Sequence, residues 1–204
     1  DGEYLYDGTG KTAEGVTYDQ LTFDGKTYTV EGLESSLTKT DAGEYTTVIT
    51  GTATVKDADG NVVTDQFMVN STDTGLLKIK PRPVTVKAAS DEKEYDGSAL
   101  TNDGWTVAEA TEDSGLVGND KIGSVQVTGS QLYPGSSANV AGNAVFETGK
   151  ASNYEVKYVN GTLKVTNRST KYVINAQAPD GEYLYDGTGK TAEGVTYDQL
   201  TFDG

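Results

Sequence analysis

The segment "YEVKYVNGTLKVTN", residues 154–167, carries the clearest structural signal in the chain. Apolar residues alternate with polar ones through both of its halves, at Tyr154, Val156, Tyr158, Leu163 and Val165. This alternation is typical of strands that bury one face. Asn160-Gly161 separates the halves, and Asn-Gly between alternating strands predicts a hairpin whose two turn residues take positive φ.

Short alternating segments between turn residues recur along the rest of the chain. Further strands are expected at 26–31, 44–50, 67–70, 76–80, 84–89, 122–128 and 171–177, with a second hairpin at 54–65 that turns at Asp59-Gly60. No stretch keeps a 3.6-residue apolar period, so helix is limited to a turn or two. The sequence predicts an all-β protein of small immunoglobulin-like β-sandwich modules, with β-grasp-like modules as the alternative.

The composition excludes several classes of chemistry. The 204 residues include no Cys and no His, which rules out a Ser-His-Asp triad, imidazole or thiolate metal ligands, and disulfides. With 16 Lys and Arg against 31 Asp and Glu, the formal charge is −15, which disfavours nucleic acid and anionic membranes as partners. No apolar run reaches the ~20 residues of a membrane span. We expect the protein to have no enzymatic activity and not to insert into a membrane.

The chain is internally repetitive. Residues 1–25 return unchanged as residues 180–204, which sets a period of 179 residues. A fainter half-period is marked by three copies of one tripeptide, Tyr6-Asp7-Gly8, Tyr95-Asp96-Gly97 and Tyr185-Asp186-Gly187. The segments "GLLKIKPRP" (75–83) and "GTLKVTNRS" (161–169) also match. The predicted organisation is module A (1–80), module B (83–167) and the start of another module A (168–204).

The junctions between these modules are short. "KIKPRPVTVK" (78–87) runs from one expected strand into the next through two prolines, which favour a stiff, extended path. "NRSTKY" (167–172) has the same place after module B, without proline. The expected shape is an elongated rod in which each module contacts only its neighbours.

Module B carries a family resemblance. "KEYDGSALTNDGW" (93–105), the Gly-Ser segment at 129–139 and "SNYEVKYVNGTLKV" (152–165) resemble the YDG-bearing MBG-type repeat modules of bacterial adhesin-like surface proteins, typically Gram-positive. Module A is similar at its Tyr-Asp-Gly, at "TDAGEYT" and at "GLLKIKPRPVTV", but its middle departs from the pattern. The resemblance implies an extracellular, cell-wall-anchored protein in a stalk or adhesive context. It brings no catalytic residues.

Two motifs each allow two interpretations. Tyr-Asp-Gly is favoured as a turn in which Gly takes positive φ, and the alternative is a binding epitope shown by every module. Asp41, Gly43 and Tyr45 have the spacing of a tyrosine corner, in which the hydroxyl bonds back to nearby backbone. The alternative for them is an ordinary turn followed by a core aromatic residue.

Candidate ligand sites are few. Trp105 is the only tryptophan and the only obvious platform for sugar stacking, although a lone Trp in a small β-domain is usually core. We expect no cofactor. "DADGN" (57–61) lacks the Gly and Glu of an EF-hand loop, and calcium stays open only through acidic pairs such as Asp91-Glu92 and Glu112-Asp113. A Lys87–Asn167 isopeptide crosslink is disfavoured, because Val84 and Val86 are expected to turn Lys87 outward.

Two functions follow from this pattern. The favoured one is a non-catalytic stalk or spacer that projects a binding region from a cell surface, with neighbouring repeats as its partners. The alternative is a weak, multivalent module for host glycan, mucin or protein. Module A also lacks the lead strand that residues 171–179 would supply, so we expect these residues of one copy to complete module A of another, head to tail.

Overall fold

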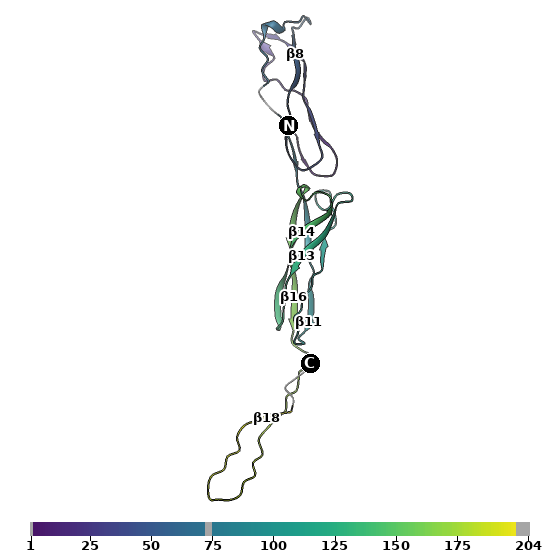
Figure 1. The fold of residues 1–204 in the computed structure, drawn as a ribbon. Helices are drawn as coiled ribbons and strands as arrows, with labels where there is room; N and C mark the ends of the chain where they lie inside the picture. The colour runs from purple at the N-terminus through teal and green to yellow at the C-terminus, as the bar shows by residue number, and fades with distance from the viewer. Residues whose placement is uncertain (1, 72–74, 199–204) are drawn as a thin grey trace.

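The computed structural model describes residues 2–71 and 75–198, and almost all of their regular structure is β (Figure 1). Within these ranges the helices are two 3₁₀ turns of three residues, η1 (Thr64–Gln66) and η2 (Ala151–Asn153). None of the helices in these ranges is long and apolar enough to cross a membrane. The all-β prediction is confirmed.

Module B contains two sheets that share a core. Its strands are β10 (Arg82–Ala88), β11 (Asp91–Glu94), β12 (Trp105–Val107), β13 (Lys121–Thr128), β14 (Gly135–Thr148), β15 (Tyr154–Val159) and β16 (Gly161–Thr166). One sheet has the order β12-β10-β15 and the other β11-β16-β14-β13. β10 and β15 are parallel, as are β11 and β16, while the remaining pairs are antiparallel. The first strands of the module therefore pair with its last ones.

The lead strand β10 fills the centre of module B. Val84, Val86 and Ala88 are fully buried, and Val86 and Ala88 pack with Ile122 of the other sheet. Lys87 between them is exposed, as the alternation of a strand requires. The expected orientation of these side chains is confirmed, and it points Lys87 away from the core that an isopeptide crosslink would need.

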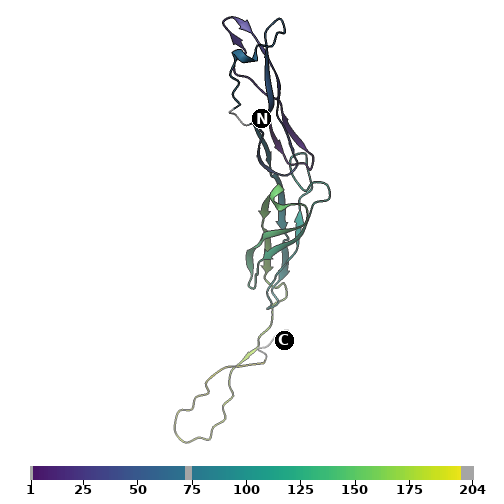
Figure 2. The ribbon, with the colours of Figure 1, turned by 45° about the horizontal axis from the view of Figure 1, so that its top comes forward.

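Module A consists of shorter strands in smaller sheets. They are β1 (Gly2–Leu5), β2 (Lys11–Glu14), β3 (Thr22–Phe23), β4 (Lys26–Thr27), β5 (Thr29–Glu34), β6 (Ser36–Lys39), β7 (Gly43–Thr46), β8 (Thr50–Lys56) and β9 (Leu76–Lys80). The sheets are β1-β9-β7, β2-β6, β3-β4 and β5-β8. In Figures 1 and 2 these strands lie above those of module B.

The two modules pair their strands in the same pattern although their sequences differ. β1 runs parallel to β9 as β11 runs parallel to β16, and β1 and β11 each end directly before a Tyr-Asp-Gly. β7 and the start of β14 then add antiparallel strands in the same register, with Gly43 opposite Ile79 and Gly135 opposite Val165. Likewise β5 pairs with β8 as β13 pairs with β14. A lead strand equivalent to β10 is not found among the described residues of module A.

The hairpin predicted at Asn160-Gly161 is wrong. β15 and β16 follow one another in the chain but belong to different sheets, so the two residues carry the chain across the core. Neither residue takes positive φ. Gly161 is needed for close approach instead, because a Cβ there would lie 2.0 Å from the backbone oxygen of Ala89.

Other strand predictions are wrong in whole or in part, because the segments find no neighbouring strand to pair with. Residues 67–70 form no strand, and within 171–177 only β17 (Ala176–Gln177) pairs, with β18 (Thr196–Tyr197). The turn at Asp59-Gly60 is present, with Gly60 at φ 84°, but the return limb of that hairpin is one bridge, Lys56 to Val62, followed by η1. Alternation shows that a segment can form a strand, and pairing decides whether it does.

Candidate functional site

The most highly organised site in the chain is the interface between modules A and B. One apolar cluster crosses it: Tyr6, Ala13, Leu77 and Ile79 of module A are buried together with Val84 and Tyr154 of module B. Pro81 alone separates β9 from β10, so the chain passes through this cluster without a flexible linker. The modules therefore share a core as well as a covalent connection.

Two tyrosines and one carboxylate stand at the centre of this interface. The rings of Tyr6 and Tyr154 meet edge to face with centroids 5.5 Å apart, and both hydroxyls donate to Oδ2 of Asp120, at 3.3 and 2.6 Å. The backbone N–H of Val117 donates to the Tyr154 hydroxyl at 3.0 Å. Burial, followed by the nearby Asp120 carboxylate, raises the pKa of both phenols above the ordinary value. The interface thus holds both tyrosines in the neutral form.

This arrangement predicts that alkali weakens the interface. The folded-state pKa values of Tyr6 and Tyr154 lie above the unfolded value of about 10, so their stabilising effect is complete below that pH and is lost as pH rises through the folded values. We expect tyrosine absorbance to show these phenols ionising after the exposed ones, with a parallel fall in melting temperature. Simultaneous ionisation of all tyrosines near pH 10 with no loss of stability would contradict this.

Asp41 connects the modules at the edge of the interface. Its carboxylate forms an ion pair with Lys150 and accepts a hydrogen bond from Asn153 Nδ2 at 3.0 Å, while Asn153 Oδ1 accepts the Ala42 N–H at 2.8 Å. These bonds, with Lys150 the larger cause, lower the pKa of Asp41. The Tyr45 hydroxyl donates to the Asp41 carbonyl at 3.0 Å, which is the bond of a tyrosine corner. The corner fixes the loop that presents Asp41 to module B.

Arg82 lies at the point where the chain enters module B. Its side chain is buried, and its guanidinium donates to four backbone carbonyls, those of Tyr6, Thr111, Glu112 and Ser114, at 3.4, 2.6, 2.7 and 3.3 Å. The first carbonyl belongs to module A and the others to a loop of module B. A planar guanidinium has five N–H donors and can bond several carbonyls at once, whereas a lysine ammonium, a compact group with three donors, could not reproduce this arrangement.

The Tyr-Asp-Gly motif forms a turn in all three copies. Asp7 accepts both the backbone N–H and the hydroxyl of Thr9 and pairs with Lys11, and Asp96 makes the equivalent bonds with Ser98 and Lys93. These bonds, with the lysine the largest cause, lower the pKa of Asp7 to about 2. The glycines Gly8, Gly97 and Gly187 have φ of 79°, 85° and 77°. The aspartates are occupied by their own turns, as a structural motif requires.

The other sequence-predicted residues lie apart from the interface. Tyr95 is at the opposite end of module B, stacked on Tyr133 with centroids 6.4 Å apart. Trp105 is half-buried on β12 and packs against the cluster that contains Val86 and Ala88, so its ring belongs to the core. In the described residues no group of three or more acidic side chains could hold a metal ion. Asp57 accepts the N–H groups of Asp59 and Asn61 within its turn.

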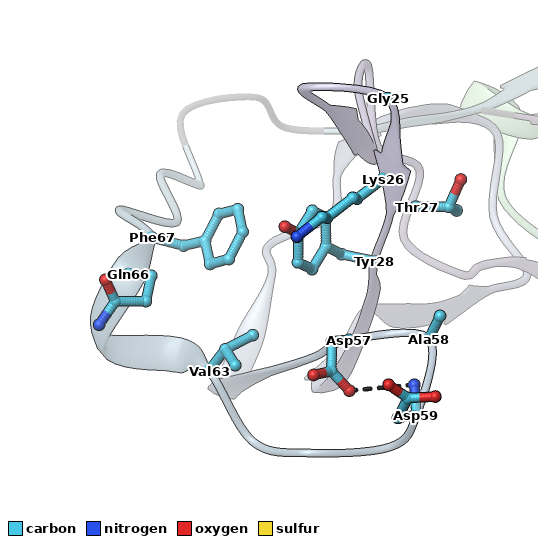
Figure 3. A pocket seen from close by; sticks show the side chains of 10 residues that line it. All are labelled: Gly25, Lys26, Thr27, Tyr28, Asp57, Ala58, Asp59, Val63, Gln66 and Phe67. Atoms are coloured by element: carbon cyan, nitrogen blue, oxygen red, sulfur yellow. Dashed lines mark hydrogen bonds between the residues drawn. The ribbon is translucent and has the colours of Figure 1, made fainter.

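Module A has a hollow at the end farthest from module B. It measures about 650 Å³, and the rings of Tyr28 and Phe67 line it side by side, edge to face, with centroids 4.8 Å apart (Figure 3). Phe23 joins these two rings, with centroids 5.6 Å from Phe67 and 6.2 Å from Tyr28. We name Phe23, Tyr28 and Phe67 the aromatic cluster. Three charged residues, Lys26, Asp57 and Asp59, also line the hollow.

Only part of the interface was recognisable in the sequence. Tyr6 and Asp41 were predicted, because both belong to motifs, whereas four other residues of the interface were not: Arg82, Asp120, Lys150 and Asn153. Arg82 could have been found, since it aligns with Arg168 in the matching segments 75–83 and 161–169, and each arginine donates to the carbonyl of the preceding Tyr-Asp-Gly tyrosine. Asp120 and Asn153 have no counterpart of the same type in module A and carried no such signal.

Comparison with protein-family models, with curated proteins and with solved structures finds no match to this chain. The function proposed below therefore rests on the sequence and on the geometry of the interface.

Proposed function

We propose that this chain is a non-catalytic repeat segment of a bacterial cell-surface adhesin, acting as a stalk that holds a binding region away from the cell. The observation that carries the proposal is the interface between modules A and B. A chain whose task is spacing needs stiff joints more than a unique site, and here the joint shares a buried core, an ion pair and a buried arginine. Verbatim repetition of residues 1–25 as 180–204 agrees with a role that depends on length.

The fold within this proposal is a series of small β-sandwiches arranged as a rod. Two sheets with a common core in module B favour the sandwich. The parallel pairs β10–β15 and β11–β16 depart from a purely antiparallel immunoglobulin-like arrangement and keep the β-grasp-like alternative open. Both folds place the two ends of a module at opposite poles, which suits an extended array.

A second function is favoured by the hollow beside the aromatic cluster. Aromatic rings next to polar groups are common in carbohydrate sites, so each repeat could bind host glycan or protein weakly and gain avidity from repetition. Asp57 and Asp59 lie at the rim of this hollow (Figure 3). Trp105 does not support this function, because its ring packs in the core.

Small-angle scattering and a glycan and mucin binding screen on the full chain separate the two functions. The stalk predicts an extended particle and no binding above background. Binding that is lost in Tyr28→Ala or Phe67→Ala, and kept in a Trp105→Phe control, would replace the stalk with the binding module.

A further inference from the structure

The first and last strands of module B run side by side. β10 pairs in parallel with β15 over six residue pairs, which begin with Arg82 opposite Tyr154. β11 then pairs in parallel with β16 over four more, which begin with Asp91 opposite Leu163. The partners are separated by the same distance along the chain in both sheets, so one register relates the beginning of the module to its end.

Side-chain contacts continue this register between and beyond the strand pairs. Where both segments cross from one sheet to the other, Ser90 Oγ accepts the Thr162 N–H at 2.9 Å. Farther along, Glu92 and Lys164 form an ion pair at 3.0 Å. Both contacts join residues that are 72 positions apart, which is also the offset of the strand pairs. The pairing therefore passes from β10–β15 to β11–β16 without a slip.

The crossing point also locks the two segments against each other. Gly161 passes so close to the other segment that a Cβ on it would lie 2.0 Å from the backbone oxygen of Ala89. Asn139 Nδ2 holds that oxygen in place with a hydrogen bond of 2.9 Å. Sliding one segment past the other by one residue would bring Asn160 or Thr162, which both carry a Cβ, to this point. Steric contact therefore opposes sliding in addition to the strand pairing.

Tension along the two modules would load all of these pairs together. The chain enters module B beside module A, through β10, and leaves it at the opposite end, after β16 (Figure 1). Pulling these ends apart moves β10 and β11 in one direction and β15 and β16 in the other, along the strand axes. Because hydrogen bonds are evenly spaced in a parallel pair, they share the load and must break nearly together. Val84, Val86 and Ala88 of β10 are fully buried, so water cannot readily replace the broken bonds.

We propose that module B is a tension-bearing clamp, in which the parallel pairing of its first and last strands resists a pull along the chain. This function goes beyond spacing, because a spacer has to be stiff but need not withstand a pull. Forced unfolding is governed by the rate at which a module unfolds, and the clamp keeps that rate low under load. β1 and β9 give module A four residue pairs of the same parallel kind.

Pulling single molecules of the full chain in two directions tests the clamp. The chain has no cysteine, so two double variants place handles at exposed positions alone: Lys80→Cys with Thr170→Cys, and Lys121→Cys with Thr148→Cys. The first variant loads β10 and β16 along their length. The second separates β13 from β14 starting at one end, because Lys121 and Thr148 are opposite each other in that antiparallel pair. We expect module B to open at a several-fold greater force in the first direction than in the second.

The length released shows which part of the module has opened. In the first direction we expect one step of about 270 Å, the extended length of residues 80–170 less their folded span. In the second, residues 121–148 should open first and release about 90 Å. Without handles, both variants should unfold at the same denaturant concentration, so that the difference in force reflects direction alone.

Two results would overturn the clamp. One is an equal opening force in the two directions, and the other is a gradual lengthening of module B in the first direction. Neither result bears on the stiffness of the joint between the modules, so the stalk could still hold if the clamp fails.

Discussion

Replacing Arg82 with alanine should destabilise the protein by about 3 kcal/mol and uncouple the two modules. The guanidinium is buried, and its removal leaves the carbonyls of Tyr6, Thr111 and Glu112 without this donor. The Ser114 carbonyl keeps the Thr111 N–H as a donor. Two of these bonds, to Thr111 and Glu112, are 2.6 and 2.7 Å long and hold the loop that covers Tyr154. Thermal unfolding should change from one transition to two, as module A loses support before module B.

Arg168→Ala is the matched control for this substitution. Arg168 makes the same kind of bond, to the Tyr95 carbonyl, but at the other end of module B. It stacks on Tyr172 with its guanidinium carbon 4.0 Å from the ring centroid, outside the A–B interface. Its loss should change stability by less than about 1 kcal/mol and leave unfolding unchanged in form. Equal effects of the two substitutions would contradict a special role for Arg82.

Replacing Gly161 with alanine should be as damaging, for a steric reason. The new Cβ would lie 2.0 Å from the Ala89 oxygen and 2.6 Å from its carbonyl carbon, and both are backbone atoms that cannot rotate away. The start of β16 or the end of β10 must move, which disturbs the core where Leu163 and Ala88 are fully buried. We expect a loss of about 3 kcal/mol or failure to fold, measured by chemical denaturation.

Gly142→Ala gives the comparison for Gly161→Ala. Gly142 also lies in a strand of module B, but an added Cβ there meets no atom within 4 Å, and its φ is not positive. Its stability should stay within about 0.5 kcal/mol of wild type. If Gly161→Ala were equally mild, Gly161 would not be the close-approach residue described above, and a turn role would have to be reconsidered.

The sequence predicted the elements better than their connections. The strands at 76–80, 84–89 and 122–128 appear close to their expected positions, because alternation reports which face a segment buries. The hairpin predicted at Asn160-Gly161 was wrong. A short polar break between two strands looks the same in sequence whether the chain turns back within one sheet or crosses to another sheet. Only the packing of β15 on β10 and of β16 on β14 distinguishes these cases.

The residues of the A–B interface also divide into those that a local motif predicts and those that only long-range contacts reveal. Tyr6, Asp41 and Tyr45 were recognisable because local motifs marked them, and Tyr45 makes the bond that its motif implies. Asp120, Lys150 and Asn153 lie 34 residues or fewer apart in the chain, but each has its partner in module A more than 100 residues away. No local spacing can report such a contact.

Distance measurement between two spin labels, one in each module, tests most directly whether the joint is stiff. The chain has no cysteine, so Glu34→Cys and Ser124→Cys place labels at exposed positions of β5 and β13 alone. A stiff joint predicts one narrow distance distribution, which broadens when Arg82→Ala is added. A broad distribution in the chain with Arg82 intact would show that the modules move independently, and it would contradict the stalk.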